Sequence, residues 1–197
     1  MPAPKQTGVT AATWNSLIMD AAVAYLNYGS TDENYPERIL GATNGGVSFG
    51  WAEFNMRHPE IDGLKGSMKG ASRITQAIPQ LEVNLVEWSL ENLLLAFPGC
   101  EVEVSGVGAA QITTLTRSNR LIAPEEYPLN VAMVGTQSGT GLPVVAIIKN
   151  PLVVEGVELA TQEDSETTTP VIFVGHYDPE NPEDEPWEIR FPTPVED

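Results

Sequence analysis

The 197-residue chain is poor in the residues from which catalytic and metal sites are usually built. It has one cysteine, Cys100, and two histidines, His58 and His176. A single cysteine excludes an intramolecular disulfide framework and is typical of proteins that fold in a reducing compartment. No run of about 18 apolar residues occurs, and the N-terminal residues lack the apolar stretch of a secretory signal. We therefore expect neither a membrane segment nor a secreted, disulfide-bonded domain.

Sequence motifs of catalysis and nucleotide binding are missing as well. The chain contains no G-x-S-x-G, H-E-x-x-H or C-x-x-C. Residues 106–111 lack the third glycine of a dinucleotide-binding loop. The glycine-rich residues 135–141 lack the lysine of a phosphate-binding loop, so we predict a hairpin turn there. The histidines are interpreted as surface or hydrogen-bonded residues, and Cys100 as a small buried or edge residue. The sequence thus predicts no enzyme, no catalytic residue and no cofactor.

The charge of the chain is strongly and unevenly acidic. The chain has ten Lys and Arg residues and 27 Asp and Glu residues, which gives a formal net charge of −17. Such a surface repels phosphate backbones, so tight nucleic-acid binding is disfavoured. Residues 155–197 hold 13 acidic residues and one basic residue, Arg190, whereas residues 57–73 hold four basic and two acidic residues. One segment is therefore cationic and another is strongly anionic.

Many short β-like runs and a single helix predict a mainly β protein. Over residues 81–85, apolar and polar residues alternate as in a half-buried strand. Ser89 is a good N-cap for a helix over residues 89–97, which a Pro-Gly pair ends. Its expected buried stripe is Leu90, Leu93, Leu94 and Phe97. Further strands are predicted at Ile112–Leu115, Leu129–Val134, Val144–Ile148, Leu152–Leu159, Val171–Tyr177 and Trp187–Phe191. The pattern predicts one domain, residues 1–197, built as a sandwich or barrel.

Residues 1–13 are interpreted as an arm. The two segments that follow them have less decisive patterns. Residues 16–28 have apolar residues at helical spacing. Residues with high β-propensity at the end of this segment, and Gly29 as its end point, allow a strand instead. Residues 44–45, Asn-Gly, predict a turn. The turn would lead into a strand with one apolar face, formed by Val47, Phe49 and Trp51.

The strongest candidate for a binding site is the loop over residues 57–73. A long ordered loop on a β scaffold is usually a binding device. Its glycines permit backbone angles that other residues resist, and its cations suit an acidic partner. The candidate residues are Arg57, Gly63, Lys65, Gly66, Lys69, Gly70 and Arg73. The alternatives are a mobile surface excursion and a phosphate site.

A C-terminal arm over residues 178–197 is the candidate acidic surface. Its acidic residues are Asp178, Glu180, Glu183, Asp184 and Glu185. Carboxylates are Ca²⁺ ligands, but the spacing and central glycine of an EF-hand are absent, so we interpret the segment as solvated rather than metal-binding. Two unlike patches that complement each other make a heterologous contact, which closes into rings or propagates as a filament. The two candidates together indicate a protein that recognises copies of itself.

Four segments, in order, resemble one known family. They are LGATNGGVSF (40–49), IDGLKGSMKGASRI (61–74), LEVNLVEWSLENLLLAFPG (81–99) and FVGHYDPENPEDEPWEIRF (173–191). This ordered set resembles the major tail tube proteins of long-tailed, siphovirus-type bacteriophages. The similarity extends from residue 15 to residue 191 and is weakest over residues 100–128.

The resemblance implies two packed antiparallel sheets, barrel-like and flanked by one helix, with extended loop and terminal arms. Residues 89–97 would be the helix, residues 57–73 a loop that reaches a neighbouring ring, residues 178–186 a late arm and residues 23–28 a strand. Six subunits would form a ring, and rings would stack into the hollow tube of the virion tail. The tube would assemble in the bacterial cytoplasm around a tape-measure protein, meet terminator and tip proteins, and conduct DNA. Carboxylates such as Glu82 are candidates for its lumen, because they offer DNA no phosphate contacts.

A β-sandwich binding module, such as a carbohydrate-binding or virion decoration domain, is the alternative function. It would expose aromatic platforms, for which Trp14, Trp51 and Trp187 are available. A hydrolase with scattered carboxylates has no motif to support it. A self-assembling structural protein without catalysis is therefore the function that the sequence predicts.

Overall fold

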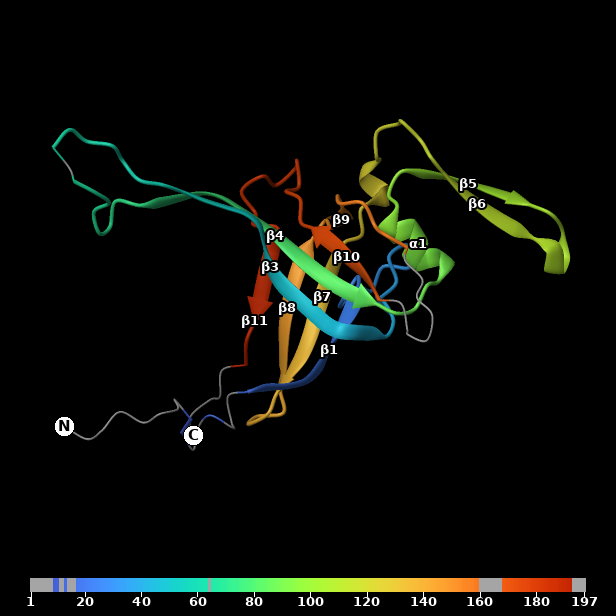
Figure 1. Ribbon diagram of the computed structural model, residues 1–197, viewed down its shortest axis with the longest axis horizontal. Coiled ribbons are helices and arrows are strands. Elements are labelled where there is room, and N and C mark those ends of the chain that lie inside the picture. The colour runs from blue at the N-terminus through green and yellow to red at the C-terminus, as the bar shows by residue number, and fades with distance from the viewer. Residues whose placement is uncertain (1–8, 11–12, 14–16, 64, 160–167, 193–197) are drawn as a thin grey trace.

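Two antiparallel sheets packed face to face form the body of the protein (Figure 1). The computed structural model describes residues 9–10, 13, 17–63, 65–159 and 168–192. The five-stranded sheet has the order β11 (Trp187–Arg190), β8 (Pro143–Lys149), β7 (Asn130–Gln137), β1 (Ile18–Leu26) and β2 (Arg38–Ile39). The four-stranded sheet has the order β3 (Thr43–Arg57), β4 (Arg73–Leu85), β10 (Thr169–Val174) and β9 (Leu152–Val153). The predicted mainly β fold with two antiparallel sheets and one helix is confirmed.

A small sheet, one helix and two short turns lie outside these sheets. A two-stranded sheet consists of β5 (Cys100–Ser105) and β6 (Ile112–Arg117). The helix α1 (Leu90–Ala96) follows β4, and single 3-10 turns occur at η2 (Gly108–Ala110) and η3 (Pro124–Glu126). The sequence predicted β6 but not β5.

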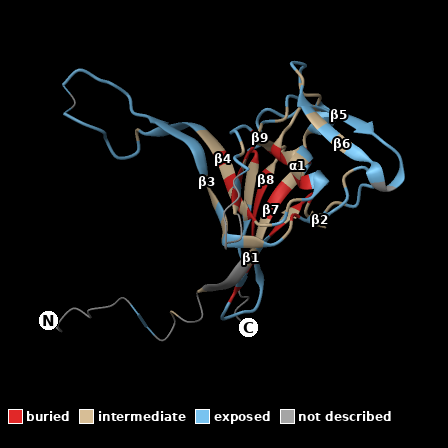
Figure 2. Cartoon of the chain, turned by 45° about the vertical axis from the view of Figure 1, so that its right-hand side comes forward, coloured by how far each residue is buried: buried red, intermediate tan, exposed pale blue. Residues whose placement is uncertain are grey.

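The core lies between the two large sheets and extends to α1 (Figure 2). The alternation predicted for β4 is confirmed, because Leu81, Val83 and Leu85 are buried while the residues between them are half-buried. They meet apolar residues of the five-stranded sheet, among them Val131 and Ile148, both fully buried. Burying these side chains is the main favourable term that holds the two sheets together.

The N-terminal segment with helical spacing is a strand. β1 pairs antiparallel with β7 from Val23–Val134 to Leu26–Val131. Ala24 and Leu26 point into the core, whereas Val23 is exposed on the other face. The strand that the resemblance implied for residues 23–28 is therefore confirmed up to Leu26, and the helical spacing is incidental.

The turn predicted at Asn44-Gly45 is wrong, because these residues form a bulge inside β3. Thr43 lies opposite Leu85 and Val47 lies opposite Val83, so three residues of β3 face one residue of β4. Gly45 and Gly46 both have positive φ, at 90° and 85°. A bulge needs such angles as much as a turn does.

The helix has the predicted ends but a different buried face. Asn92 N donates to Ser89 Oγ at 3.1 Å, as expected of an N-cap. Asn92 and Ala96 are buried, whereas Leu90 is 45% exposed and Leu94 is 36% exposed, so the predicted leucine stripe is wrong for these two residues. The helix is rotated because the Asn92 side chain bonds to Arg38 and to the Leu40 carbonyl.

Two ribbons project from opposite ends of the long axis of the molecule (Figure 1). One is the continuation of β3 and β4, which pair from Glu53–Ile78 to Arg57–Arg73, although β10 pairs with β4 only over Gln80–Leu85. We call residues 53–78 the arm. The other is the β5–β6 hairpin, residues 100–117. Both are coloured almost wholly as exposed in Figure 2.

The segments predicted as terminal arms are only partly described. The predicted arm over residues 1–13 lies mostly outside the described residues, as does the end of the chain from residue 193. Within the predicted arm 178–197, the structure has a loop, then β11 paired with β8 from Trp187–Ile148 to Arg190–Val145. The strand predicted at residues 187–191 is therefore confirmed.

Candidate interaction surfaces

An aromatic cluster joins the arm to the body. The rings of Trp51 and Trp187 meet edge to face with centroids 5.1 Å apart. Phe49 and Phe54 lie 5.9 Å and 5.8 Å from Trp51 on either side. Such ring contacts stabilise beyond the area that they bury. The direction of the arm is therefore set by side-chain packing at its base.

The arm has one apolar and one polar face. Cross-strand pairing places Phe54 beside Ala77 and Met56 beside Ile74. Phe54, Met56 and Ile74 are 46–54% exposed. On the opposite face, Asn55 Nδ2 donates to Gln76 Oε1 at 3.0 Å. Exposed apolar side chains gathered on one face are typical of an interaction site.

The candidate cations gather at the end of the arm. Arg57 lies directly opposite Arg73, and like charges in such a pair repel. Lys65 and Lys69 are exposed in the connecting loop, residues 58–72. None of these four cations forms an ion pair with a described residue. The arm therefore presents four basic side chains without an ion-pair partner among the described residues, although Glu53, Glu60 and Asp62 lie in the same arm.

The connecting loop has its own internal contacts. Of the three candidate glycines, Gly63 and Gly70 have positive φ, at 88° and 85°, whereas Gly66 does not. His58 Nδ1 and Ser72 Oγ lie 2.8 Å apart and close the loop at its base. His58 is thus hydrogen-bonded, as the sequence predicted. The exposed Ile61 and Met68 add apolar surface to the loop.

The β5–β6 hairpin also has two unlike faces, and the sequence analysis missed it as a candidate. Val102 pairs with Leu115 and Val104 with Thr113 on one face, where the two valines are 49% and 53% exposed. The other face carries Glu101 and Glu103. Both carboxylates are exposed and form no ion pair with a described residue. The alternation of Val with Glu in residues 101–104 is the signal that could have revealed this strand.

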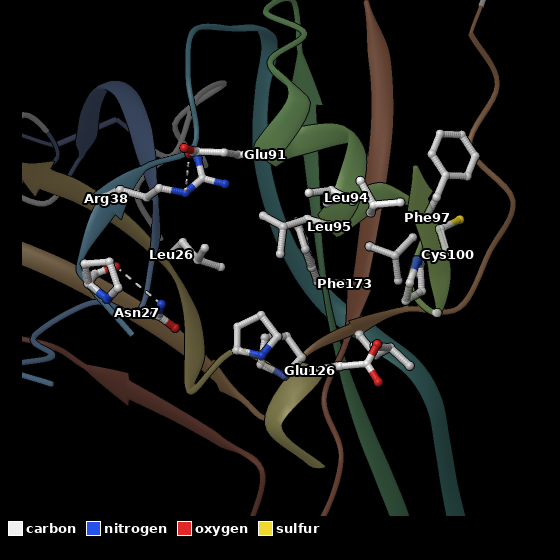
Figure 3. Close-up of a pocket in the computed structure, with 18 of the residues that line it drawn as sticks. Leu26, Asn27, Arg38, Glu91, Leu94, Leu95, Phe97, Cys100, Glu126 and Phe173 are labelled. Atoms are coloured by element: carbon white, nitrogen blue, oxygen red, sulfur yellow. Dashed lines mark hydrogen bonds and ion pairs between the residues drawn. The ribbon is translucent and has the colours of Figure 1, made fainter. Parts of the chain in front are cut away.

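A groove of about 540 Å³ runs beneath α1 (Figure 3). Its walls are mainly apolar and include Leu26, Leu94, Leu95, Phe97 and Phe173. Cys100 lies in it, but no described residue that lines it is a histidine, so the groove contains no thiol–imidazole pair. The groove offers apolar contact rather than a catalytic arrangement.

Arg38 and Glu91 line one end of this groove (Figure 3). Arg38 Nη1 donates to Asn92 Oδ1 at 2.9 Å, and Arg38 Nε lies 3.5 Å from Glu91 Oε2. Burial lowers the pKa of Arg38, and Glu91 acts in the opposite direction. Asn92 Nδ2 donates to the Leu40 carbonyl at 2.6 Å. These bonds connect α1 to the chain around β2.

A second ion pair lies at the other end of the groove. Arg120 Nη2 donates to Glu126 Oε2 at 2.7 Å, and the Ala123 backbone N–H donates to Glu126 Oε1, also at 2.7 Å. These bonds lower the pKa of Glu126 to about 2, with the Arg120 bond as the larger cause. Both ends of the groove are therefore held by internal pairs.

The acidic candidate segment is anchored at the base of the arm. The Gly175 N–H donates to the Pro79 carbonyl at 3.0 Å before the segment, and Trp187 packs on Trp51 after it. Within the segment, the Glu180 N–H donates to Asp178 Oδ1 at 2.9 Å. The carboxylates of Glu180, Glu183, Asp184 and Glu185 are exposed. The structure thus brings the acidic segment near the start of the arm of its own chain, and not near its tip.

Metal and catalytic geometry are not evident in the described residues. Within them, no group of three His, Cys, Asp or Glu side chains is placed to hold a metal ion. His176 Nδ1 lies 3.2 Å from the Asn150 carbonyl oxygen, and its ring packs against Tyr127. His176 is thus hydrogen-bonded, as the sequence predicted. Across the described part of the chain, no helix is both long enough and apolar enough to cross a bilayer.

No family model matches the chain, and no curated protein sequence matches it.

Proposed function

We propose that this chain is a structural protein that assembles with copies of itself into the tail tube of a long-tailed bacteriophage. In this proposal six subunits form a ring and the rings stack into a hollow tube. The tube would form in the bacterial cytoplasm around a tape-measure protein, end at terminator and tip proteins, and conduct DNA in the finished virion. The chain would act without catalysis and without a cofactor.

The observation that carries the proposal is the arm. It is a two-stranded ribbon that extends beyond the four-stranded sheet, with an exposed apolar face and four cations that form no ion pair with a described residue. Isolated two-stranded ribbons are marginally stable in water, and a contact with another molecule stabilises them. Because the chain has a net charge of −17, any second copy is on balance strongly negative. A cationic arm on an acidic protein is therefore complementary to that protein itself.

The fold is consistent with the resemblance found in the sequence. Two packed antiparallel sheets with one flanking helix are what the tail tube family would have, and residues 61–74, part of the resembling set, form the end of the arm. The arm and the β5–β6 hairpin leave opposite ends of the body (Figure 1). Unlike surfaces at opposite ends favour a heterologous contact, which propagates.

The alternative, a sandwich that binds ligands on aromatic platforms, has weaker support. Trp14 lies outside the described residues. Trp51 and Trp187 pack edge to face on each other and with Phe49, so they do not form an open flat platform. Quenching of tryptophan fluorescence by a soluble glycan, without any growth in particle size, would favour this alternative.

Charge reversal on the arm tests the proposed function. We expect the triple variant Lys65→Glu, Lys69→Glu, Arg73→Glu to remain folded, because all three side chains are exposed, and to assemble only at a concentration about tenfold or more above that of the wild type. Sedimentation velocity over a concentration series measures the onset of assembly, and circular dichroism checks the fold.

The matched control keeps the charge and changes the side chains. Lys65→Arg, Lys69→Arg, Arg73→Lys should assemble as the wild type does. If the triple reversal variant forms large particles at wild-type concentrations, the arm does not make the assembly contact. Surface ion pairs contribute only about 0–1 kcal/mol each, so backbone pairing and apolar burial must supply most of the assembly energy.

A further inference from the structure

Both projecting ribbons have strand edges that are free within the described chain. Over residues 53–57 and 73–78 the strands of the arm pair only with each other, and β5 and β6 likewise pair only with each other. A free edge presents unpaired N–H and C=O groups that can accept another strand. A sheet of three or more strands with an apolar face is far more stable than a two-stranded ribbon. Each ribbon would therefore be stabilised by an added strand.

The two ribbons also have matching pairs of faces. The arm carries Phe54, Met56 and Ile74 on one face and the Arg57–Arg73 pair on the other. The β5–β6 hairpin has Val102, Val104 and Leu115 on one face and Glu101 and Glu103 on the other. In both ribbons an apolar face is backed by a charged face. Arg57 and Arg73 lie on that face of the arm, with Glu53 nearer the body, whereas Glu101 and Glu103 lie on that face of the hairpin.

We infer that the arm of one copy pairs edge to edge with β5 of a second copy, forming one intermolecular four-stranded sheet. In this arrangement the apolar faces become continuous. On the other face, the arginine of the arm strand that pairs with β5 lies beside Glu101 and Glu103, and the second arginine lies one strand further away. If the arm were turned over, Phe54 and Met56 would lie beside the carboxylates of β5. Pairing apolar with apolar and charged with charged faces therefore selects one orientation of the arm. The inference rests on the proposed self-assembly and names the surface that receives the arm.

The partner is a second copy because the geometry forbids the contact within one chain. The arm and the β5–β6 hairpin project from opposite ends of the body (Figure 1). The acidic segment, residues 178–185, is the rival acceptor, but Gly175 and Trp187 hold it at the base of the arm. Copies stacked along the arm direction would present their β5–β6 end, and not this segment, to the incoming arm.

A charge-swap series tests this pairing. Glu101→Lys with Glu103→Lys should raise the concentration needed for assembly about tenfold or more, because like charges then face the arm. The matched control Glu180→Lys with Glu183→Lys changes net charge by the same amount at exposed carboxylates of the rival segment, and should assemble as the wild type does. Combining Glu101→Lys and Glu103→Lys with Arg57→Glu and Arg73→Glu should restore assembly.

The outcomes separate the inference from the proposed function. If the wild type stays monomeric at every concentration, the proposed function fails. If the wild type assembles and the Glu101→Lys, Glu103→Lys variant does so equally well, only the inference fails. If the Glu180→Lys, Glu183→Lys variant is the defective one, residues 178–185 receive the arm and the inference is overturned.

Hydrogen exchange supplies a readout that does not depend on charge. Edge pairing should slow amide exchange in residues 100–105 when the wild type passes from monomer to assembled particle, while the amides of β8, already within a sheet, should change little. Unchanged exchange rates in residues 100–105 would overturn the edge pairing.

Discussion

At the scale of single residues, Asn92 is the polar side chain on which the position of α1 depends most. It is 4% exposed, donates to the Leu40 carbonyl and accepts from Arg38. We expect Asn92→Ala to lower the free energy of unfolding by about 1–3 kcal/mol, because a buried carbonyl and a half-buried guanidinium lose their partner. Urea unfolding followed by circular dichroism measures the change. Ser118→Ala, at a half-buried position that makes none of these bonds, is the control, and an equal loss in both variants would contradict this role.

The pair Arg120–Glu126 predicts a titration that can be measured directly. The pKa of Glu126 is about 2, below its ordinary value of 4.5, because Arg120 and the Ala123 N–H bond to its carboxylate. A carboxylate with a lowered pKa stabilises the fold above its unfolded pKa, and this contribution is lost as the pH falls through about 2. We expect an NMR midpoint near 2 for Glu126 and a higher midpoint in Arg120→Gln. A wild-type midpoint at the ordinary value would show that the pair does not form in solution.

At the scale of elements, the aromatic cluster at the base of the arm controls how firmly the arm is held. Trp51 contacts Phe49, Phe54 and Trp187 and is 37% exposed. We expect Trp51→Ala to cost about 1–3 kcal/mol of stability, less than for a fully buried ring, and to speed amide exchange along the arm. Trp51→Phe, which keeps a ring, should lose less. Unaltered exchange in residues 53–57 of Trp51→Ala would mean that the arm is held by other contacts.

The elements that the sequence predicted best are those whose signals are local. The alternation over residues 81–85 and the Ser89 cap depend on neighbours along the chain, and both are confirmed. The Asn44-Gly45 pair predicts backbone angles with positive φ, which both a turn and a bulge need. Only the pairing with the neighbouring strand decides whether a turn or a bulge forms. The buried face of α1 depends on Arg38 and Leu40, which lie about fifty positions away in the chain, so leucine spacing alone could not locate it.

The candidate site could be predicted only in part, because its charge is a local property of the sequence and its contacts are not. The composition of residues 57–73 reveals a cationic loop, but whether its cations are neutralised depends on distant residues. β5 has a local signal in the alternation of Val with Glu over residues 101–104, but the sequence does not show that both faces of this strand are exposed. The role of its two faces is seen only when they are compared with those of the arm.

At the scale of the whole molecule, charge would govern what the proposed particle can bind. On the outer face of the four-stranded sheet, Glu82 lies between Ser48 and Ile172, and Gln80 and Asn84 are its neighbours along β4. With a net charge of −17 and no cation among these residues, neither the subunit nor the particle should bind duplex DNA at moderate salt.

Fluorescence anisotropy of a labelled duplex measures this absence of binding. Glu82→Lys tests the candidate lumen residue, since a cation facing the channel would create phosphate contacts and retain the duplex in assembled particles. Tight binding of the duplex to wild-type particles would contradict a channel through which DNA slides freely.

The most direct test of the account is an electron cryo-microscopy map of the particles that we propose the purified chain forms at high concentration. The account predicts stacked rings in which each arm lies against a neighbouring copy, with its apolar face covered. A map with arms in open solvent, touching no other copy, would contradict the central claim that the arm joins identical molecules.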